Sequence, residues 1–484
     1  MDAFRVSPTD NVAVALRPLA AGESAAGVTV ASDVAKGHKI AVEPIAAGEP
    51  VLKYGFPIGT ATRDIAPGEH VHTHNLRTAL ATTGAYAYQP AAQPAPRPVE
   101  AGFMGYRRAD GRVGTRNEIW VIPTVGCVAR TAQKIAERAH RLHAGHGVDG
   151  VHAFAHPFGC SQLGDDLAGT ARLLAGLASH PNAGGVLIVG LGCESNQTSN
   201  LLKLIDHPNI RTLGAQVAED EVEEGLALVA GLVEQARAEP AAAPLSDLVL
   251  GVKCGGSDGF SGLTANPLVG RMSDAVTASG GTAILTEIPE IFGAEQLLME
   301  RASDEQVFGE IVDLVNGFKR YFTDHGEPVS ENPSPGNIAG GITTLEEKSL
   351  GAVQKGGHAP VTDVLGYGER VRKPGLALLE APGNDAVSST ALAAAGATVI
   401  LFTTGRGTPL GFPVPTVKIA SNHELARRKP NWIDFDAGDV LDRGMEPAAE
   451  DLLRLVCKVA SGNQTAAERN DEREIAIWKR GVTL

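Results

Sequence analysis

The chain has 484 residues, a formal net charge of −14 and 43% hydrophobic residues. Its length corresponds to about three domains of roughly 150 residues each, and its apolar content argues against disorder. The acidic balance disfavours a protein that coats nucleic acid or anionic lipid. No run of 18 apolar residues occurs, and the N-terminus has no apolar stretch typical of a signal peptide. The five cysteines are spread along the chain, which is typical of a reduced protein. We therefore predict a cytoplasmic protein with neither membrane nor nucleic-acid partners.

The first 84 residues contain short apolar segments separated by turn signals such as AAGE, AKGH and APGE. Turns at this spacing predict a small all-β module over residues 1–84. Residues 85–102 follow, with prolines at positions 90, 94, 96 and 98. Such a segment is expected to be extended and to pair poorly, so it predicts a linker.

From residue 103 onward, continuous apolar segments alternate with helical ones, as in IWVIPTVGC followed by TAQKIAERAHRLHAG. This alternation predicts an α/β body with parallel sheets covered on both faces. A weaker composition break, AEPAAAPLS, covers residues 238–246 and favours two sheets over one. We predict a middle domain over residues 103–240 and a C-terminal domain over residues 241–484.

Most of the predicted strands end in glycine next to a residue with a polar, titratable or metal-binding side chain. In open α/β sheets, ligands bind beyond the carboxyl ends of the strands, but Gly, Asn and Asp also make ordinary turns there. No dinucleotide fingerprint, phosphate-binding loop or serine nucleophile elbow is present, which disfavours nucleotide-dependent redox chemistry, phosphoryl transfer and serine hydrolysis. The residues at these ends are Cys127, His156, Cys160, Cys193, Glu194, Lys253, Asp258, Glu287, Glu290, Asn384, Asp385 and Arg406.

The N-terminal module contains one compact histidine group, GEHVHTHN at residues 68–75. In a strand, His70, His72 and His74 would project to one face because the side-chain period is two. Imidazoles at this spacing are suitable ligands for iron, manganese or zinc. The alternative is a polar, exposed strand face. His38 could join the group if the fold brings it close.

Four cysteines, at positions 127, 160, 193 and 254, follow apolar segments and adjoin glycine. They could hold iron or an iron–sulfur cluster, which needs three or four convergent thiolates. No pair has the short CxxC spacing, and free cysteine is also a common small buried residue.

The segment RRADGRVGTRNE, residues 107–118, is locally basic within an acidic protein. Its arginines could bind the carboxylate of a substrate bidentately. They could equally belong to a solvated hairpin that turns at Asp110 and Gly111.

Long motifs in the chain resemble the altronate/galactarate dehydratase family, whose members begin with a β-clip (SAF) domain. GHKIA, KYGFPIG and GEHVHTHN resemble the SAF domain. YRRADGRVGTRNEIWVIPTVGC, GCSQLGDD, KCGGSDGFSGLTANP, ENPSPGN, GGITTLEEKSLG and FTTGRGTP resemble the family's body. The resemblance runs from about residue 10 to the C-terminus. It implies a SAF domain, a middle domain that forms a homodimer and a Rossmann-like C-terminal domain.

The resemblance also implies an activity. The expected reaction is loss of water from D-altronate to give 2-dehydro-3-deoxy-D-gluconate, a step in the breakdown of hexuronates such as galacturonate. The expected cofactor is Fe(2+), with Mn(2+) as a possible substitute, and no nucleotide is expected. Two alternatives stay open: a dehydratase of a related sugar acid such as galactarate, and a non-enzymatic protein that binds sugar acids.

These expectations assign roles to particular residues. A mononuclear site of nitrogen and oxygen ligands is favoured over an iron–sulfur cluster because no cysteines are paired at short spacing. We predict metal contacts from His72 and His74, delivered by a hinged N-terminal module, with Asp258, Glu194 and Cys160 as rival ligands. The acid–base pair is expected among His156, Lys253, Glu287 and Glu290. Substrate contacts are expected from Arg116, Arg406 and Asn384.

Overall fold

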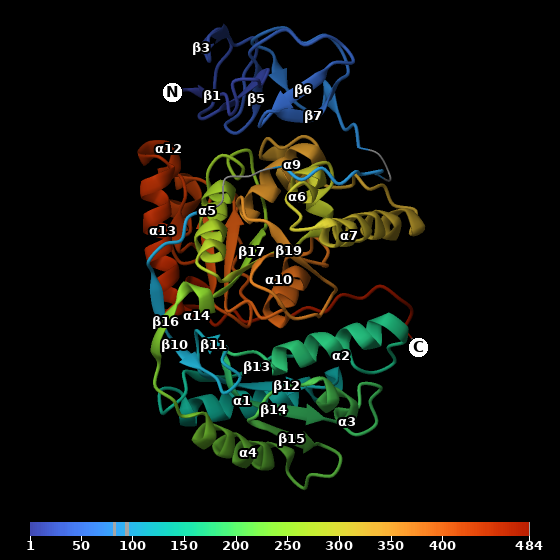
Figure 1. Ribbon diagram of the computed structural model, residues 1–484, viewed down its shortest axis with the longest axis vertical. Helices are drawn as coiled ribbons and strands as arrows, with labels where there is room; N and C mark the ends of the chain where they lie inside the picture. Colours follow the sequence, from blue (N-terminus) through green and yellow to red (C-terminus); the bar gives the residue numbers. More distant parts are fainter. Residues whose placement is uncertain (81–83, 92–95, 484) are drawn as a thin grey trace.

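The computed structural model describes residues 1–80, 84–91 and 96–483. Three modules follow one another along the longest axis of the molecule, and Figure 1 shows the N-terminal module at one end and the middle module at the other. The C-terminal module lies between them. Parts of the predicted linker, residues 92–95, lie outside the described residues.

The N-terminal module, residues 1–80, is built from short antiparallel strands, as the closely spaced turn signals predict. One sheet has the order β1-β2-β5-β8 and a second the order β6-β7-β9, and β3 and β4 form a separate pair. The strands are β1 (Ala3–Phe4), β2 (Val12–Ala15), β3 (Ser24–Ala25), β4 (Val28–Thr29), β5 (Lys39–Ala41), β6 (Pro50–Lys53), β7 (Phe56–Ala61), β8 (His70–Val71) and β9 (Leu76–Arg77).

The middle module, residues 102–244, centres on a four-stranded parallel sheet of order β13-β12-β14-β15. Helices α1 and α4 pack together over one face of this sheet, and α2 lies between the sheet and the C-terminal module. Its strands are β10 (Gly102–Arg107), β11 (Val113–Gly114), β12 (Glu118–Pro123), β13 (Gly150–Ala153), β14 (Ala183–Gly190), β15 (Ile210–Gly214) and β16 (Ala241–Pro244). Its helices are η1 (Gly126–Val128), α1 (Ala129–His143), α2 (Gly164–Ala178), α3 (Thr198–Leu201), η2 (Leu202–Leu204) and α4 (Glu221–Ala236).

The C-terminal module, residues 245–483, contains a seven-stranded parallel sheet of order β19-β20-β18-β17-β21-β22-β23. The body therefore holds two parallel sheets, as the composition break at residues 238–246 predicts. The strands are β17 (Val249–Cys254), β18 (Thr282–Leu285), β19 (Val361–Leu365), β20 (Gly375–Leu379), β21 (Val399–Thr404), β22 (Thr416–Ala420) and β23 (Phe435–Asp436). The helices are η3 (Leu245–Asp247), α5 (Ala265–Ala278), η4 (Ile288–Ile291), α6 (Glu295–Met299), α7 (Glu305–Asp324), α8 (Pro335–Ala339), α9 (Leu345–Ala352), η5 (Val353–Gly356), α10 (Asp385–Ala394), α11 (His423–Arg428), α12 (Asp439–Arg443), α13 (Met445–Ala460) and α14 (Ala466–Arg469).

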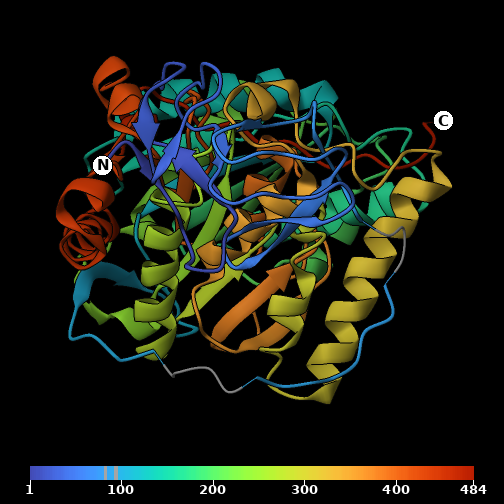
Figure 2. The same ribbon diagram turned by 90° about the horizontal axis from the view of Figure 1, so that it is seen from above.

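A buried cluster of charged side chains joins the N-terminal module to the C-terminal module. Lys39 and Lys53 donate to the Glu347 carboxylate of α9 at 2.9 and 2.8 Å, and Lys39 also donates to the Gly341 carbonyl at 2.8 Å. All three charged side chains are at most 1% exposed. Figure 2 shows the N-terminal module lying over the C-terminal one. The predicted hinge motion stays a prediction, and it would have to break these buried ion pairs.

No helix among the described residues is long and apolar enough to cross a membrane.

Candidate active site

A chamber of about 430 Å³ opens at the carboxyl edge of the C-terminal sheet. It lies where β17 ends, between η4, α8, α9 and the beginning of α10. Ligands of open α/β sheets bind at this edge. We call this cavity the lysine chamber; its lining residues are Cys254, Gly255, Gly256, Glu290, Asn332, Ser334, Asn337, Lys348, Gly383, Asn384, Asp385, Ala386 and Leu410.

An ion pair between Lys348 and Glu290 faces the lysine chamber. The Lys348 ammonium donates to Glu290 Oε1 at 2.9 Å, to Asn332 Oδ1 at 2.9 Å and to Asn337 Oδ1 at 3.2 Å. Burial disfavours the charged ammonium, but the Glu290 carboxylate outweighs burial and raises the pKa of Lys348. Lys348 is therefore a protonated acid at neutral pH, next to a carboxylate.

Cys254, at the end of β17, lies in the wall of the chamber. Lys355 Nζ is 2.8 Å from its sulfur, and the Cys254 thiol donates to Glu290 Oε2 at 3.3 Å. Burial raises the pKa of Cys254 to about 12 in spite of the nearby Lys355 ammonium. The group is thus a neutral thiol at neutral pH, a hydrogen-bond donor rather than a nucleophile.

Lys253 and Glu287 lie behind this wall and do not line the chamber. Lys253 donates to Asp385 Oδ1 at 2.7 Å and lies 3.1 Å from Glu287 Oε1. Glu287 accepts from the Cys254 N–H at 2.9 Å and from Lys355 at 3.1 Å. Its backbone φ of 65° places it in the left-handed region, where strain is stored at functional sites. The structure thus brings Lys253, Glu287 and Glu290 together, and only Glu290 faces the chamber.

The charges of this cluster balance without a metal ion. Cys254, Glu287 and Glu290 place ligand atoms within 4.8 Å of one another, which is compatible with metal binding. However, the ammonium groups of Lys253, Lys348 and Lys355 already compensate the three carboxylates of Glu287, Glu290 and Asp385. A divalent cation would have to displace at least one ammonium, so this donor set does not fit one. The other such group among the described residues is His423, Asp439 and Asp442, near the surface.

The histidines of the N-terminal module gather in one cluster, in which His38 and His72 contact carbonyl groups of α8. His38 Nδ1 is 3.0 Å from His70 Nε2. The His38 and His72 rings stack with their centroids 4.8 Å apart, and the centroids of the His70 and His74 rings are 5.4 Å apart. Burial lowers the pKa of His38 and His72, and that of His70 to about 4. Neutral imidazoles are the form that binds metals, so these residue types suit a divalent first-row cation. As placed, however, both ring nitrogens of His38 and of His72 are hydrogen-bonded, and among the described residues these histidines form no group of three whose ligand atoms lie within 4.8 Å of one another.

The reason given for this cluster from the sequence was wrong. β8 ends at Val71, and His72 to Asn75 form a turn in which the Asn75 and Leu76 N–H groups donate to the His72 carbonyl. His72 therefore does not share a strand face with His70. His72 Nε2 instead contacts the Ile338 carbonyl at 3.1 Å, His38 Nε2 contacts Ala339 at 3.3 Å, and His74 is exposed.

Two predicted site residues have structural roles. Arg116 binds both oxygens of Glu468, at 2.8 and 3.0 Å, and is 3% exposed, so it joins the middle and C-terminal modules and cannot anchor a substrate. His156 is buried in the middle module, with its ring nitrogens at 2.8 Å from the Pro123 carbonyl and 3.2 Å from the Phe158 N–H. Neither ring nitrogen is left for acid–base work.

The three rival metal ligands also do not converge on the histidines. Both Asp258 oxygens are occupied, Oδ1 by Ser261 and Ser421 and Oδ2 by Asn422. Glu194 accepts from the Thr124 hydroxyl at 2.6 Å and from N–H groups of its own loop. Cys160 and Glu194 belong to the middle module, at the opposite end of the molecule from the histidines (Figure 1).

Asn384 and Arg406, the two other predicted substrate contacts, lie beside the lysine chamber; that they bind substrate stays a prediction. Asn384 is exposed, lines the chamber and caps α10 by accepting from the Ala386 and Val387 N–H groups at 3.1 Å. Arg406 is exposed and donates to the Gly336 carbonyl at 3.3 Å, so most of its guanidinium stays available.

Sequence reasoning missed Lys348 and Lys355 as members of the site, and Asp385 was noted only as a strand-end residue. Lys348 follows GGITTLEE on a helix rather than a strand end, and Lys355 lies on η5. Only the quoted motif GGITTLEEKSLG marked this segment as unusual.

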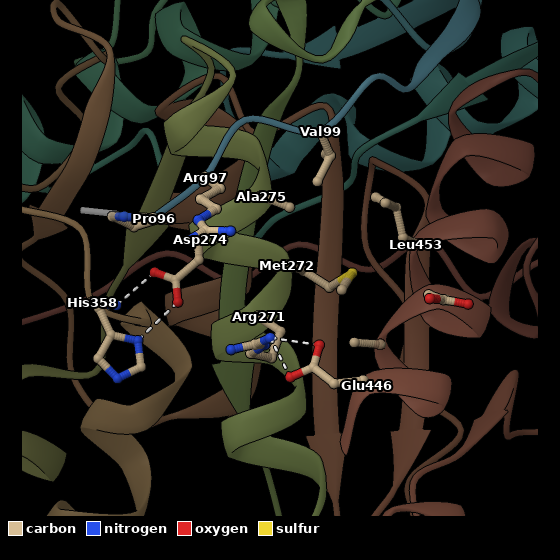
Figure 3. A pocket seen from close by; sticks show the side chains of 12 residues that line it. Pro96, Arg97, Val99, Arg271, Met272, Asp274, Ala275, His358, Glu446 and Leu453 are labelled. Atoms are coloured by element: carbon tan, nitrogen blue, oxygen red, sulfur yellow. Dashed lines mark hydrogen bonds and ion pairs between the residues drawn. The ribbon is translucent and has the colours of Figure 1, made fainter. Parts of the chain in front are cut away.

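A second cavity, of about 610 Å³, lies between α5 and α13 (Figure 3). Its charged side chains pair with one another: Asp274 binds His358 at 2.9 Å, and Arg271 binds Glu446. This cavity lacks the coupled lysine and carboxylate groups of the lysine chamber, so we place the chemistry in the chamber.

A β-module is docked over a Rossmann-like sheet, and the carboxyl edge of that sheet holds paired ammonium and carboxylate groups. These features are typical of a metabolic α/β enzyme whose site contains groups suited to proton transfer. Three family models match the chain: the altronate/galactarate dehydratase SAF domain at residues 1–79, the D-galactarate dehydratase/altronate hydrolase second domain at residues 105–237 and the D-galactarate/altronate dehydratase C-terminal domain at residues 245–483. The chain belongs to the altronate/galactarate dehydratase family.

Curated relatives match along nearly the whole chain. An altronate dehydratase of Escherichia coli is 51% identical over 100% of both chains, and one of Bacillus subtilis is 50% identical over 99% of both. A galactarate dehydratase of Escherichia coli is 34% identical over 95% of this chain and 93% of its own.

Proposed function

We propose that this protein is a hydro-lyase that removes water from D-altronate to give 2-dehydro-3-deoxy-D-gluconate, in the breakdown of hexuronates such as galacturonate. The single observation that carries this substrate is the identity of about half of all residues, over the full length, with two curated altronate dehydratases. The galactarate dehydratase is more distant, which places galactarate second.

The lysine chamber supplies groups for each proton transfer. We assign Glu290 as the base that takes the C2 proton, and Lys348 as the acid that protonates the 3-hydroxyl as it leaves as water. The electron pair of the C2–H bond forms the C2–C3 double bond, and the resulting enol tautomerises to the 2-keto acid. Because the Lys348 ammonium is 2.9 Å from Glu290, acid and base share one small site. Lys253, Lys355 and Glu287 are positioning residues: Lys253 holds Asp385, Lys355 holds the Cys254 sulfur, and Glu287 accepts from the Cys254 N–H.

Substrate binding is assigned to polar groups of the chamber wall. Arg406, at the rim, is proposed to bind the carboxylate, and Asn332 and Asn384 the hydroxyl groups. These amides are proposed to discriminate among sugar acids, because a hydroxyl of the wrong orientation would leave a polar group of the bound substrate unpaired. Asn337 positions Lys348 instead, because its amide donates to the Ser257 carbonyl and accepts from Ser334 and Lys348.

The proposed cofactor is Fe(2+), with Mn(2+) as a partial substitute. The imidazoles of His72 and His74, with His38 and His70 beside them, are the ligands proposed for it, and the ring nitrogens of His38 and His72 would have to leave their present hydrogen bonds to converge on the cation. When bound, the cation supplies a Lewis acid for a substrate carboxylate and 2-hydroxyl. A site of nitrogen and oxygen ligands holds Fe(2+) only modestly, because Fe(2+) is low in the affinity order of divalent metals. Chelators should therefore abolish turnover reversibly, Fe(2+) should restore it fully and Mn(2+) in part.

The deciding assay is anaerobic turnover with Fe(2+) on altronate, galactarate, galactonate and sulfolactate, measured as release of the 2-keto acid. The highest kcat/KM on altronate would support the assignment, and the highest value on galactarate would overturn it. Calorimetric binding of altronate without turnover under reducing conditions would instead support a sugar-acid binding protein.

We further propose that the protein acts in the cytoplasm as a homodimer formed through the middle module, with domain boundaries near residues 84, 102 and 240. Light scattering on the purified full chain would measure the oligomeric state.

A further inference from the structure

Three of the five cysteines are exposed, and all three lie at one edge of the middle sheet. Cys127, Cys160 and Cys193 follow strands β12, β13 and β14, which are adjacent and parallel. Free cysteine is normally among the most buried residue types, so three exposed thiols at one sheet edge need an explanation other than packing. The other two cysteines differ: Cys254 is buried in the lysine chamber wall, and Cys457 lies on α13.

Backbone contacts tie the three cysteine loops together. The Gly126 N–H donates to the Phe158 carbonyl at 2.8 Å, and the Asn196 N–H donates to the Gly159 carbonyl at 2.9 Å. The Asn196 side chain donates to the Thr124 carbonyl at 3.0 Å. A Cβ atom at Gly159 would lie 2.1 Å from the Thr124 oxygen, so only glycine allows this approach. Each cysteine is within three residues of one of these contacts.

The loop of Cys160 has two further unusual features. Ser161 has a φ of 57°, in the left-handed region that serine rarely adopts. The next residue, Gln162, is 4% exposed; its Oε1 accepts from the Gly159 N–H, and its Nε2 has no hydrogen-bond partner. A strained residue and a buried donor without a partner, both adjacent to a thiol, are features of a ligand site rather than of an ordinary loop.

The donor set points to a cluster rather than to a single ion. Within the described part of the chain, these thiols are in no group of three metal-binding side chains whose ligand atoms lie within 4.8 Å of one another. They therefore do not surround one ion, whereas the thiolates of a cluster bind different iron atoms. Glu194 cannot complete a mononuclear site because its oxygens are taken by Thr124, Leu191 and Gly192.

We propose that Cys127, Cys160 and Cys193 ligate a four-iron iron–sulfur cluster, whose fourth iron has no protein thiolate. Thiolates are the usual ligands of such clusters, and hydrogen bonds to their sulfurs tune the reduction potential. Gln162 Nε2, two residues from Cys160, is a buried donor without a partner. This site is separate from the imidazole site proposed for Fe(2+) and does not depend on altronate as the substrate.

The test is anaerobic reconstitution of the full chain with ferrous iron and sulfide. We expect about four iron and four acid-labile sulfide per chain, a brown colour, and a paramagnetic signal after reduction. The triple variant Cys127→Ser, Cys160→Ser, Cys193→Ser should lose all of these, while Cys457→Ser, the matched control, keeps them. Absence of labile sulfide in the wild-type chain, binding of iron without sulfide, or an unchanged cluster in the triple variant would each overturn the proposal.

If the triple variant does not fold, thiol protection in the wild-type chain replaces it. Cluster assembly should shield Cys127, Cys160 and Cys193 from a maleimide, measured by peptide mass spectrometry, and should leave Cys457 unchanged. Equal labelling before and after reconstitution would show that the thiols hold no cluster. Neither readout uses turnover, so failure of this proposal is distinguishable from failure of the proposed function.

Discussion

The two parallel sheets of this protein present contrasting carboxyl edges. The edge of the C-terminal sheet is a chamber whose ammonium and carboxylate groups compensate one another and, apart from Asp385, are almost fully buried. The edge of the middle sheet presents three exposed thiols and one internally satisfied carboxylate, that of Glu194. We therefore propose that the same architecture serves proton transfer where charges are paired and desolvated, and soft-metal binding where thiols are exposed. The loops that follow the strands, rather than the fold, decide which chemistry an edge can perform.

The largest effect is expected from removing the acid of the lysine chamber. Lys348→Met should lower kcat by about 10²- to 10⁴-fold, because general acid catalysis is lost and Glu290 is left without its partner. The iron and sulfide content of the middle module should not change. Lys319→Met is the matched control, because Lys319 forms a comparable buried pair with Glu295, 2.7 Å away, outside the chamber. An active Lys348→Met variant would show that Lys348 is not the acid and that the reaction takes place outside the lysine chamber.

The two edges should also differ in thiol reactivity. The Cys254 pKa of about 12 implies a thiolate fraction about 10³-fold below that of an ordinary cysteine at neutral pH. Before reconstitution, Cys127, Cys160 and Cys193 should react rapidly with a maleimide, and Cys254 should react only after unfolding. Time-resolved peptide mass spectrometry measures all four rates in one sample. Rapid labelling of Cys254 in the folded chain would contradict the buried, neutral thiol described here.

The docking of the N-terminal module gives an asymmetric prediction. Glu347→Gln leaves two buried ammonium groups uncompensated and should destabilise the docked state by about 3–5 kcal/mol. Lys39→Met should destabilise the docked state much less. Burial already lowers the pKa of Lys39 to about 8, so the Lys39 charge is less well compensated than that of Lys53. The midpoint of the first unfolding transition in urea measures both. Equal losses in the two variants would show that the cluster does not act as two lysines sharing one carboxylate.

The same cluster predicts a pH dependence. Burial opposes the charged form of Glu347, but Lys39 and Lys53 outweigh it and hold the pKa of Glu347 well below its usual value. Because the folded-state pKa is the lower one, the stabilisation is fully present above the unfolded value of about 4.3. It is lost progressively as the pH falls below that value toward the folded pKa. The unfolding midpoint should fall with acid in the wild-type chain, and Glu347→Gln should show a weaker dependence.

The fold was largely predictable because its signals are local. Strand-sized apolar segments, turn residues and the break near residue 240 predict a β module and an α/β body with two sheets. Charge pairing is not local: Arg116 looked like a substrate anchor because nothing in the sequence shows that Glu468, 352 positions away, binds it. Likewise, Lys348 reaches Glu290 only through the packing of α9 beside η4. The absence of CxxC spacing argued against a cluster, yet the three cysteine loops become neighbours through strand order.

The smallest effect concerns Asn384, which both lines the lysine chamber and caps α10. If it acts only as a cap, Asn384→Ala should cost about 1 kcal/mol of stability, and Asn384→Asp, which caps equally well, should restore both stability and kcat/KM. If it binds a substrate hydroxyl through its amide N–H₂, Asn384→Asp should restore stability while KM for altronate stays raised, because a carboxylate cannot donate. Urea unfolding and steady-state kinetics on the same three proteins separate the two outcomes. Full restoration of kcat/KM by aspartate would remove Asn384 from the substrate contacts and leave Arg406 as the remaining predicted one.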